Sequence, residues 1–369
     1  MRCFLIICCF CFALFLGVNI AAQDNKGGKD EIIRVDTQVV DVPVAVTNAK
    51  GTAVAGLKQA NFVVYEDGKR QEIADFSATA EPFEVALLLD TSGSTRNDLQ
   101  LIQRAASDFI NSLRPGDRVA IIAYNTVRDN RAAFAVTEVV SFLTGDRRAL
   151  GTAVEQVRTS NGTPYYDSLR QVVEKVFSGT PAAEFRGRRA LVALTDGVDS
   201  TSAADFEAAK GELERAGVIS FFIKVDTRDF FEESLLGDCQ SATKFSTAQI
   251  RRYYQSISAN RNMEKTFDFC KLGDFERLAV SKRLYEIADI EMNELAKTSG
   301  GRVFPVGDLS EARSAFKSVA EEIGTKYTIG YYPSNDKKDG TYRKIKVEVV
   351  GLPKGTTVRA REGYTAPLN

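Results

Sequence analysis

Residues 85–94 read VALLLDTSGS, and this stretch decides the fold. Val85–Leu89 is a continuous apolar run, which is typical of a strand buried on both faces of a parallel sheet. A carboxylate and two hydroxyls follow at alternate positions, on Asp90, Ser92 and Ser94. Ligands of doubly wound sheets bind outside the carboxyl ends of the strands, so the stretch predicts a buried strand leading into a binding loop. The alternative is an ordinary turn, because Asp, Ser and Gly are common turn formers.

Strands and helices alternate downstream of this run. Short apolar runs predict further strands at 118–124, 136–143, 190–194, 219–225 and 302–306. Apolar residues at helical spacing predict helices at 99–113, 147–158, 169–177, 203–216, 284–297 and 308–324. Alternation of this kind predicts an α/β fold with a doubly wound, mostly parallel sheet.

The two ends of the chain have a period of two instead, which predicts β-structure. Near the start, the turn at Glu66–Lys69 predicts a hairpin between 62–65 and 71–76. Near the end, strands are predicted at 327–333, 344–350 and 357–361. Three strands alone make a marginal sheet. We therefore expect the N- and C-terminal segments to pair into one small β-sandwich, with the α/β domain inserted between its halves.

These patterns divide the chain into consecutive parts. We expect a signal peptide at 1–22 and a flexible leader at 23–31. The α/β domain is expected at 83–325, between the two halves of the β-sandwich at 32–82 and 326–369. Residues 227–282 do not fit the alternation and are predicted to be an insertion in the α/β domain. Within it, the basic pair Arg251–Arg252 is interpreted as a solvated helix face.

The first segment has the layout of a secretory signal peptide. Arg2 precedes an apolar run from Cys3 to Val18, and small residues close the segment. A membrane anchor is the alternative, but the run is shorter than the roughly 20 residues that span a bilayer. We therefore expect cleavage near Ala22, a secreted or periplasmic protein and no stable membrane span after cleavage.

Of the six cysteines, all but Cys239 and Cys270 lie in the predicted signal peptide. In an oxidising compartment, two remaining cysteines most simply form one disulfide, which would staple the insertion. Two separate buried thiols are the alternative.

The composition excludes several classes of function. The chain has no histidine, which excludes Ser-His-Asp and Cys-His catalysis, HExxH zinc sites and His-bound haem. Lys and Arg number 48 against 49 Asp and Glu, so no net basic charge draws the chain to nucleic acid. What remains is chemistry by oxygen ligands, by Lys or Tyr, or no chemistry.

Two more polar turns accompany the first. The strand at 190–194 ends in Thr195-Asp196-Gly197, which places a second carboxylate at a strand's carboxyl end. The loop Ser160–Pro164 precedes an amphipathic helix and offers the hydroxyl of Thr163. Carboxylate and hydroxyl oxygens are hard ligands that suit Mg²⁺ or Mn²⁺.

This series of turns resembles the metal-ion-dependent adhesion site of von Willebrand factor A (VWA) domains, with its D-x-S-x-S motif, a later Thr and an Asp in a T-D-G-like turn. The resemblance implies five metal ligands, namely Asp90, Ser92, Ser94, Thr163 and Asp196. It also implies Mg²⁺ as the cofactor, with Mn²⁺ possible and Ca²⁺ less suited. In the family, the ion typically binds an Asp or Glu carboxylate of a protein partner, so it acts as a bridge rather than a catalyst.

The flanking segments resemble bacterial exported "VWFA-related" proteins, which are abundant in acidobacteria. The matching segments are Val42–Val46, Asn61–Gly68, Gly300–Phe304, Tyr327–Pro333 and Arg361–Tyr364. Together the resemblances imply a non-enzymatic exported binding or adhesion module. One alternative is a structural scaffold of the cell envelope whose metal site is incidental. A serine acyl-enzyme is a remote alternative, since Ser241-x-x-Lys244 begins a motif series whose spacings are far too short.

Overall fold

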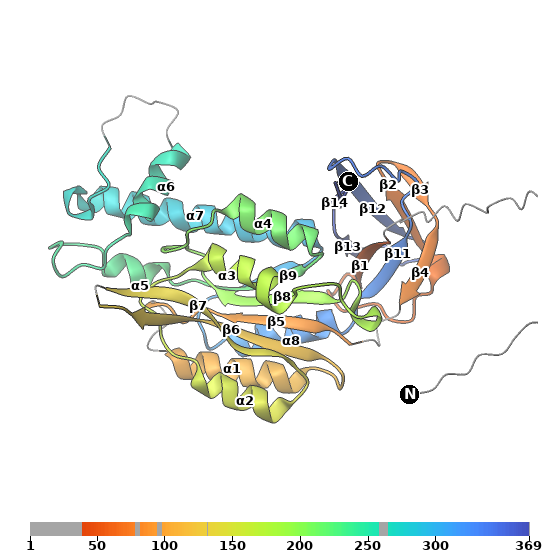
Figure 1. Cartoon of the computed structure of the whole chain (residues 1–369), viewed down its shortest axis with the longest axis horizontal. Helices are drawn as coiled ribbons and strands as arrows, with labels where there is room; N and C mark the ends of the chain where they lie inside the picture. Colours follow the sequence, from red (N-terminus) through yellow and green to blue (C-terminus); the bar gives the residue numbers. More distant parts are fainter. Residues whose placement is uncertain (1–38, 78–81, 94–97, 131, 258–264, 369) are drawn as a thin grey trace, which may run out of the picture. The chain divides into compact units, whose positions relative to one another are not determined.

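The computed structural model describes residues 39–77, 82–93, 98–130, 132–257 and 265–368. The predicted signal peptide and leader, and Ser94, lie outside these residues. Within them, a six-stranded mixed sheet has the order β10-β9-β8-β5-β6-β7 (Figure 1). Neighbours are parallel except β7, which runs antiparallel to β6. The strands are β5 (Glu84–Leu89), β6 (Arg118–Arg128), β7 (Ala133–Thr144), β8 (Arg189–Thr195), β9 (Ile219–Val225) and β10 (Arg302–Val306).

Helices cover both faces of this sheet (Figure 1). One face carries α1 (Leu99–Ser112), α2 (Arg147–Gln156) and α8 (Ala312–Ile323). The other carries α3 (Tyr165–Gln171), α4 (Phe206–Arg215) and α7 (Asp274–Ser299). β5 is buried along its whole length. Leu87 lies in the apolar core under α1, α2 and α8, and Leu88 lies in the core under α3, α4 and α7. The predicted doubly wound α/β fold is therefore confirmed, as is the buried strand at its centre.

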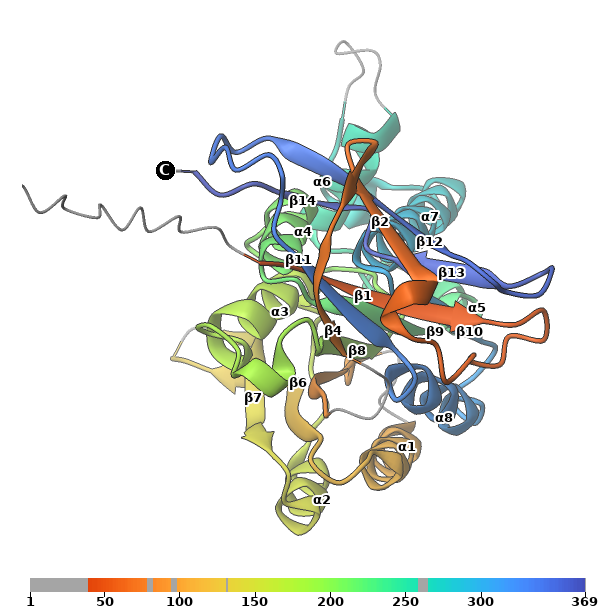
Figure 2. The same cartoon turned by 90° about the vertical axis from the view of Figure 1, so that its right-hand side faces the viewer.

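The N- and C-terminal strands form two further antiparallel sheets, ordered β13-β1-β11-β4 and β14-β12-β2-β3 (Figure 2). Each sheet combines strands from both ends of the chain, and the two share one apolar core that includes Val42, Val64 and Tyr327. This confirms the predicted pairing of head and tail. The strands are β1 (Val40–Thr47), β2 (Phe62–Glu66), β3 (Lys69–Gln71), β4 (Ile73–Ser77), β11 (Tyr327–Tyr331), β12 (Tyr342–Val349), β13 (Thr357–Ala360) and β14 (Gly363–Thr365).

The predicted hairpin is right in its turn and wrong in its second strand. Gln71 ends β3, which pairs with β2, whereas Ile73 begins β4, which pairs with β11 of the other sheet. Phe76 in β4 contacts the ring of Phe62 across the shared core and the ring of Tyr327 in its own sheet. Alternating apolar residues indicate which face of a strand is buried, but they do not indicate which strand lies beside it.

The β-sandwich contacts the amino ends of the central strands. Arg188, just before β8, donates a hydrogen bond to Ser77 Oγ at 2.6 Å. At Gly187, an added Cβ would lie 2.7 Å from Thr328 and 3.0 Å from Asp41. The carboxyl ends of the strands, where the binding loop is expected, are therefore remote from the β-sandwich.

The insertion forms a small helical unit beside α7, at the end of the sheet away from the β-sandwich (Figure 1). It contains α5 (Arg228–Glu233) and α6 (Thr247–Ile257) around a separate apolar core. Cys239 and Cys270 form the predicted disulfide, with their Cα atoms 5.3 Å apart. Residue 282, the predicted end of the insertion, falls inside α7, which begins eight residues earlier at Asp274.

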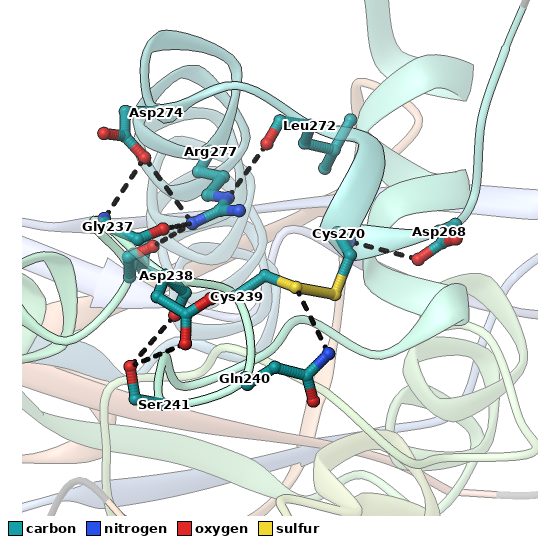
Figure 3. Close-up of a disulfide and its surroundings, with 11 residues drawn as sticks. Gly237, Asp238, Cys239, Gln240, Ser241, Asp268, Cys270, Leu272, Asp274 and Arg277 are labelled. Atoms are coloured by element: carbon teal, nitrogen blue, oxygen red, sulfur yellow. Dashed lines mark hydrogen bonds and ion pairs between the residues drawn. A yellow bond between two sulfur atoms is a disulfide. The ribbon is translucent and has the colours of Figure 1, made fainter.

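A buried arginine of α7 binds the disulfide-bonded segment through hydrogen bonds (Figure 3). Arg277 donates hydrogen bonds to the carbonyl oxygens of Leu272, Leu235 and Gly237 at 2.9–3.0 Å. Both sides of the disulfide loop are thereby held on one helix.

Short segments complete the described structure: 3-10 turns at Gln59–Asn61, Ala183–Phe185 and Phe269–Lys271, and a π-helical continuation of α3 at Val172–Val176. A helix able to cross a bilayer is absent from the described part of the chain.

Candidate functional site

The turns after β5 and β8 lie side by side because these strands are parallel neighbours, with Leu89 opposite Leu194. Asp90 N donates to the carbonyl oxygen of Leu194 at 2.9 Å. Thr195 Oγ1 donates to Asp90 Oδ2 at 2.8 Å, and Asp90 is almost fully buried. The register of the sheet therefore places the first predicted ligand beside the Thr195-Asp196-Gly197 turn.

The D-x-S-x-S turn begins with a local hydrogen bond. Ser92 N donates to Asp90 Oδ1 at 3.0 Å, a side-chain-to-backbone turn typical of Asp. Ser92 is also buried. Ser94, the third predicted ligand of this motif, falls in a stretch that the structure does not describe, so its place at the site stays a prediction.

The loop that carries Thr163 is tied to both strand turns. Ser160 N donates to the carbonyl oxygen of Thr91 at 2.7 Å. Thr163 N donates to Ser200 Oγ at 2.8 Å, and Ser200 N donates to the carbonyl oxygen of Thr163 at 3.0 Å. Three segments far apart in sequence thus converge at one end of the sheet, and Asp90, Ser92, Thr163 and Asp196 are brought together.

Asp196 accepts a hydrogen bond at each carboxylate oxygen. Val198 N donates to Oδ1 at 2.9 Å, and Thr227 Oγ1 donates to Oδ2 at 2.6 Å. The turn depends on Gly197, whose φ of 74° is in the left-handed region and whose added Cβ would lie 2.9 Å from Met292 of α7. The left-handed φ therefore favours glycine after Asp196, and Met292 packs against it.

Burial raises the pKa of both site carboxyls. For Asp90, desolvation is the dominant cause. For Asp196, desolvation and then the neighbouring charge of Asp90 raise the pKa to about 7. Two buried carboxylates that repel each other are costly in their ionised form, and a bound cation offsets that cost.

The donor set fits a hard divalent ion. The part of the chain that the structure describes contains no group of three or more His, Cys, Asp or Glu residues suited to a metal. An ion held here would therefore depend on hydroxyl oxygens together with the two carboxylates. Ser92 and Thr163 are the residues predicted to supply them, and such ligands suit Mg²⁺ and Mn²⁺ better than softer metals.

Three residues that the sequence analysis did not identify also lie at the site. Thr227 contacts Asp196, Tyr285 Oη lies 2.8 Å from Thr227 Oγ1, and Asp199 Oδ1 accepts from Tyr165 N at 2.9 Å. Burial raises the pKa of Asp199 to about 6. Thr227 lies two residues after the end of β9, so the rule that ligands gather at strand carboxyl ends could have identified it. Nothing local in the sequence indicates Tyr285.

The insertion also reaches the site's surroundings through Arg252. Arg252 forms an ion pair with Glu291 of α7, and its guanidinium lies 4.8 Å from the ring centroid of Tyr166 in α3. Tyr166 Oη in turn donates to Glu291 Oε2 at 2.8 Å. Arg251 is exposed beside Phe267. The interpretation of the basic pair as a solvated face is therefore wrong for Arg252, because burial of Glu291 calls for a cation there.

Comparisons with known proteins identify the family of the central part of the chain. Residues 84–267 match the family model for the von Willebrand factor type A domain. No curated protein matches the chain. Similar solved structures include proximal thread matrix protein 1 from the mussel byssus, at 15% identity over 70% of this chain and 50% of that one, with a TM-score of 0.43. The chain therefore spans half the length of that protein.

Two bacterial structures are also similar. BatB from Bacteroides thetaiotaomicron is 16% identical over 65% of this chain and 98% of that one, with a TM-score of 0.38. A von Willebrand factor type A protein from Catenulispora acidiphila is 13% identical over 90% of this chain and 74% of that one, with a TM-score of 0.41. The family match covers the strands β5, β8 and β9 and the three turns described above. On that match, the chain is a von Willebrand factor type A domain protein.

Proposed function

We propose that this protein is an exported, non-enzymatic binding module that captures an acidic group of a protein partner through a Mg²⁺ ion. VWA domains often mediate protein–protein interaction and are generally not enzymes, which supports the proposal. The observation that carries it is the convergence of the Asp90, Thr163 and Asp196 turns at the carboxyl ends of β5 and β8.

The ligand set explains why such a site binds a partner. Asp90 and Asp196 would supply two negative charges, and Ser92 and Thr163, with Ser94, would supply neutral hydroxyl oxygens. A bound Mg²⁺ would keep enough positive charge to attract a carboxylate from outside, and Mn²⁺ can take the same place. The partner's Asp or Glu would then complete the site.

The disulfide supports the exported location. Disulfides persist in secreted and periplasmic proteins and are rare in the reducing cytosol. The Cys239–Cys270 bond therefore fits the predicted signal peptide at residues 1–22. Edman sequencing of the exported protein should start just after Ala22, and an intact N-terminus would contradict cleavage there.

The metal site is tested by calorimetric titration of Mn²⁺ and Mg²⁺ into chelator-treated protein. We expect saturable binding in the native protein and none in Asp90→Ala. Asp117→Ala is a matched control, because Asp117 is equally buried and accepts from the backbone N–H groups of Phe83 and Arg114 at the other end of the sheet. It should lose stability and keep the ion. Equal binding in native protein and Asp90→Ala would contradict the site.

Partner chemistry is tested with a displayed library of random peptides in Mn²⁺. Peptides retained by the native protein and released by EDTA should contain Asp or Glu. They should not bind Asp90→Ala. Enrichment of peptides without acidic residues, or retention in EDTA, would favour the structural scaffold over the adhesion module.

A further inference from the structure

One oxygen of Asp196 is held by residues outside its own turn. Thr227, which contacts Oδ2 at 2.6 Å, is the second residue after β9 and the first residue of the predicted insertion. Its own hydroxyl lies 2.8 Å from Tyr285 Oη, on the fourth turn of the long helix α7. Thr227 is buried and Tyr285 is half-buried. The Asp196 carboxylate is thus linked through two hydroxyls to a helix that lies outside all three ligand turns.

The direction of these hydrogen bonds follows from the number of protons available. An ionised carboxylate can only accept hydrogen bonds, so Thr227 donates its single hydroxyl proton to Asp196 Oδ2. Thr227 Oγ1 can then only accept, so Tyr285 Oη donates to it. The resulting chain, from Tyr285 through Thr227 to Asp196, is satisfied at each step when Asp196 is ionised, which is the form that binds a cation.

We propose that Thr227 and Tyr285 are positioning residues that fix the orientation of the Asp196 carboxylate for the ion. This inference rests on the proposed function of the site. The terminal torsion of an Asp side chain has a broad energy minimum, so a carboxylate held at one oxygen can still rotate. Val198 N holds Oδ1 and Thr227 holds Oδ2, and together they define the plane in which the remaining lone pairs point.

The same contacts make the ion site depend on the insertion and α7. Tyr285 lies two helical turns after Arg277, which fastens the disulfide-bonded segment to α7. Met292 of the same helix packs against Gly197 in the Asp196 turn. Hydrogen bonds that orient metal ligands typically affect affinity by about 10- to 100-fold. Displacement of α7 would therefore weaken ion binding, even though α7 itself would not contact the ion.

The test compares variants that differ by a single hydroxyl. Thr227→Val keeps the shape of the side chain and removes the hydrogen bond, and we expect Mn²⁺ affinity to fall about 10-fold by calorimetry. Thr227→Ser restores the hydroxyl and should restore the affinity. Tyr285→Phe removes only the outer hydroxyl and should cause a smaller loss. Thr328→Val is the control, because its buried hydroxyl in the β-sandwich has no hydrogen-bond partner among the described residues.

The outcomes distinguish the hydrogen-bonded chain from Tyr285 through Thr227 to Asp196, here called the relay, from the metal site itself. Thermal melting by circular dichroism checks that each variant is folded before titration. Native affinity in folded Thr227→Val and Tyr285→Phe would overturn the relay and leave the metal site standing. Equal losses in Thr227→Val and Thr227→Ser would also overturn it, because the hydroxyl would then not be the cause. If the native protein bound no ion, the proposed metal site would fail and the relay with it.

Discussion

Gly301 shows how a single residue is constrained by the backbone that passes it. It follows Gly300, which ends α7 with a left-handed φ of 77°, and it precedes β10. A Cβ added at Gly301 would lie 1.9 Å from the carbonyl oxygen of Ser220. That atom belongs to the backbone of β9, the neighbouring strand, so it cannot move without shifting the sheet. The pair of glycines after α7 therefore has a steric reason.

We expect Gly301→Ala to lower the free energy of unfolding by about 3 kcal/mol, because the strand must shift to relieve the overlap. Gly151→Ala is the matched control, since Gly151 lies inside α2 and an added Cβ meets no atom within 4 Å among the described residues. There, alanine should raise the stability by up to about 1 kcal/mol. Urea titrations of both variants give the comparison, and a neutral Gly301→Ala would contradict the close approach.

Pairs of elements are joined in this protein by side chains that sequence patterns assign to the surface. α6 meets α7 through Arg252 and Glu291, and both meet α3 through Tyr166. Glu291 is largely buried, so its charge needs the cation. The adjacent Arg251 faces solvent in the same helix. Two neighbouring arginines thus have different energetic roles because only one points at a buried acid.

Arg252→Met should lower the free energy of unfolding by roughly 2 kcal/mol, because Glu291 would keep its buried charge without the guanidinium. Arg251→Met should change it by less than about 0.5 kcal/mol, as expected for an exposed side chain. The chain has no Trp for fluorescence, so urea unfolding of the two variants is followed by far-ultraviolet circular dichroism. Equal effects of the two substitutions would contradict the assigned pairing.

At the scale of the whole molecule, the chain passes from the α/β domain into the β-sandwich at Lys326. This lysine is fully buried between α8 and β11, and its Nζ donates to the carbonyl oxygen of Gly300 at 2.7 Å. Glu322 lies 3.8 Å away and favours the charge, while nearby Arg359 opposes it. Desolvation is the largest influence and lowers the pKa of Lys326 to about 8. A buried ammonium at this junction therefore reduces stability at neutral pH.

The pH dependence follows from this lowered pKa. Below pH 8 the folded and unfolded states both hold the proton. Between about 8 and 10.5 the folded state releases it and the unfolded state keeps it, so stability should rise with pH. The contribution of Lys326 should increase by roughly 3 kcal/mol over that interval. Urea titrations from pH 7.5 to 10 should show this rise in the native protein relative to Lys326→Met, and parallel profiles would contradict it.

Much of this protein was determined by its sequence alone. The apolar run Val85–Leu89 and the alternation around it predicted the α/β sheet, because periodicity and burial are local properties of the chain. The two polar turns after β5 and β8 predicted where Asp90 and Asp196 meet, because parallel neighbours end at the same edge. Two remaining cysteines predicted one disulfide. The metal and the acidic partner stay predictions for the experiments above.

Only the tertiary structure decided which distant residues complete the site. β4 lies in the other sheet from the β2–β3 hairpin, where it pairs with β11 and Phe76 packs against Tyr327, a residue about 250 positions later. Thr227 reaches Asp196 across 31 residues, and Arg252 reaches Glu291 across 39. Such contacts depend on how helices and strands pack, and local spacing carries no signal of them. The sequence therefore predicted the ligand residues, and packing decided which side chains contact them.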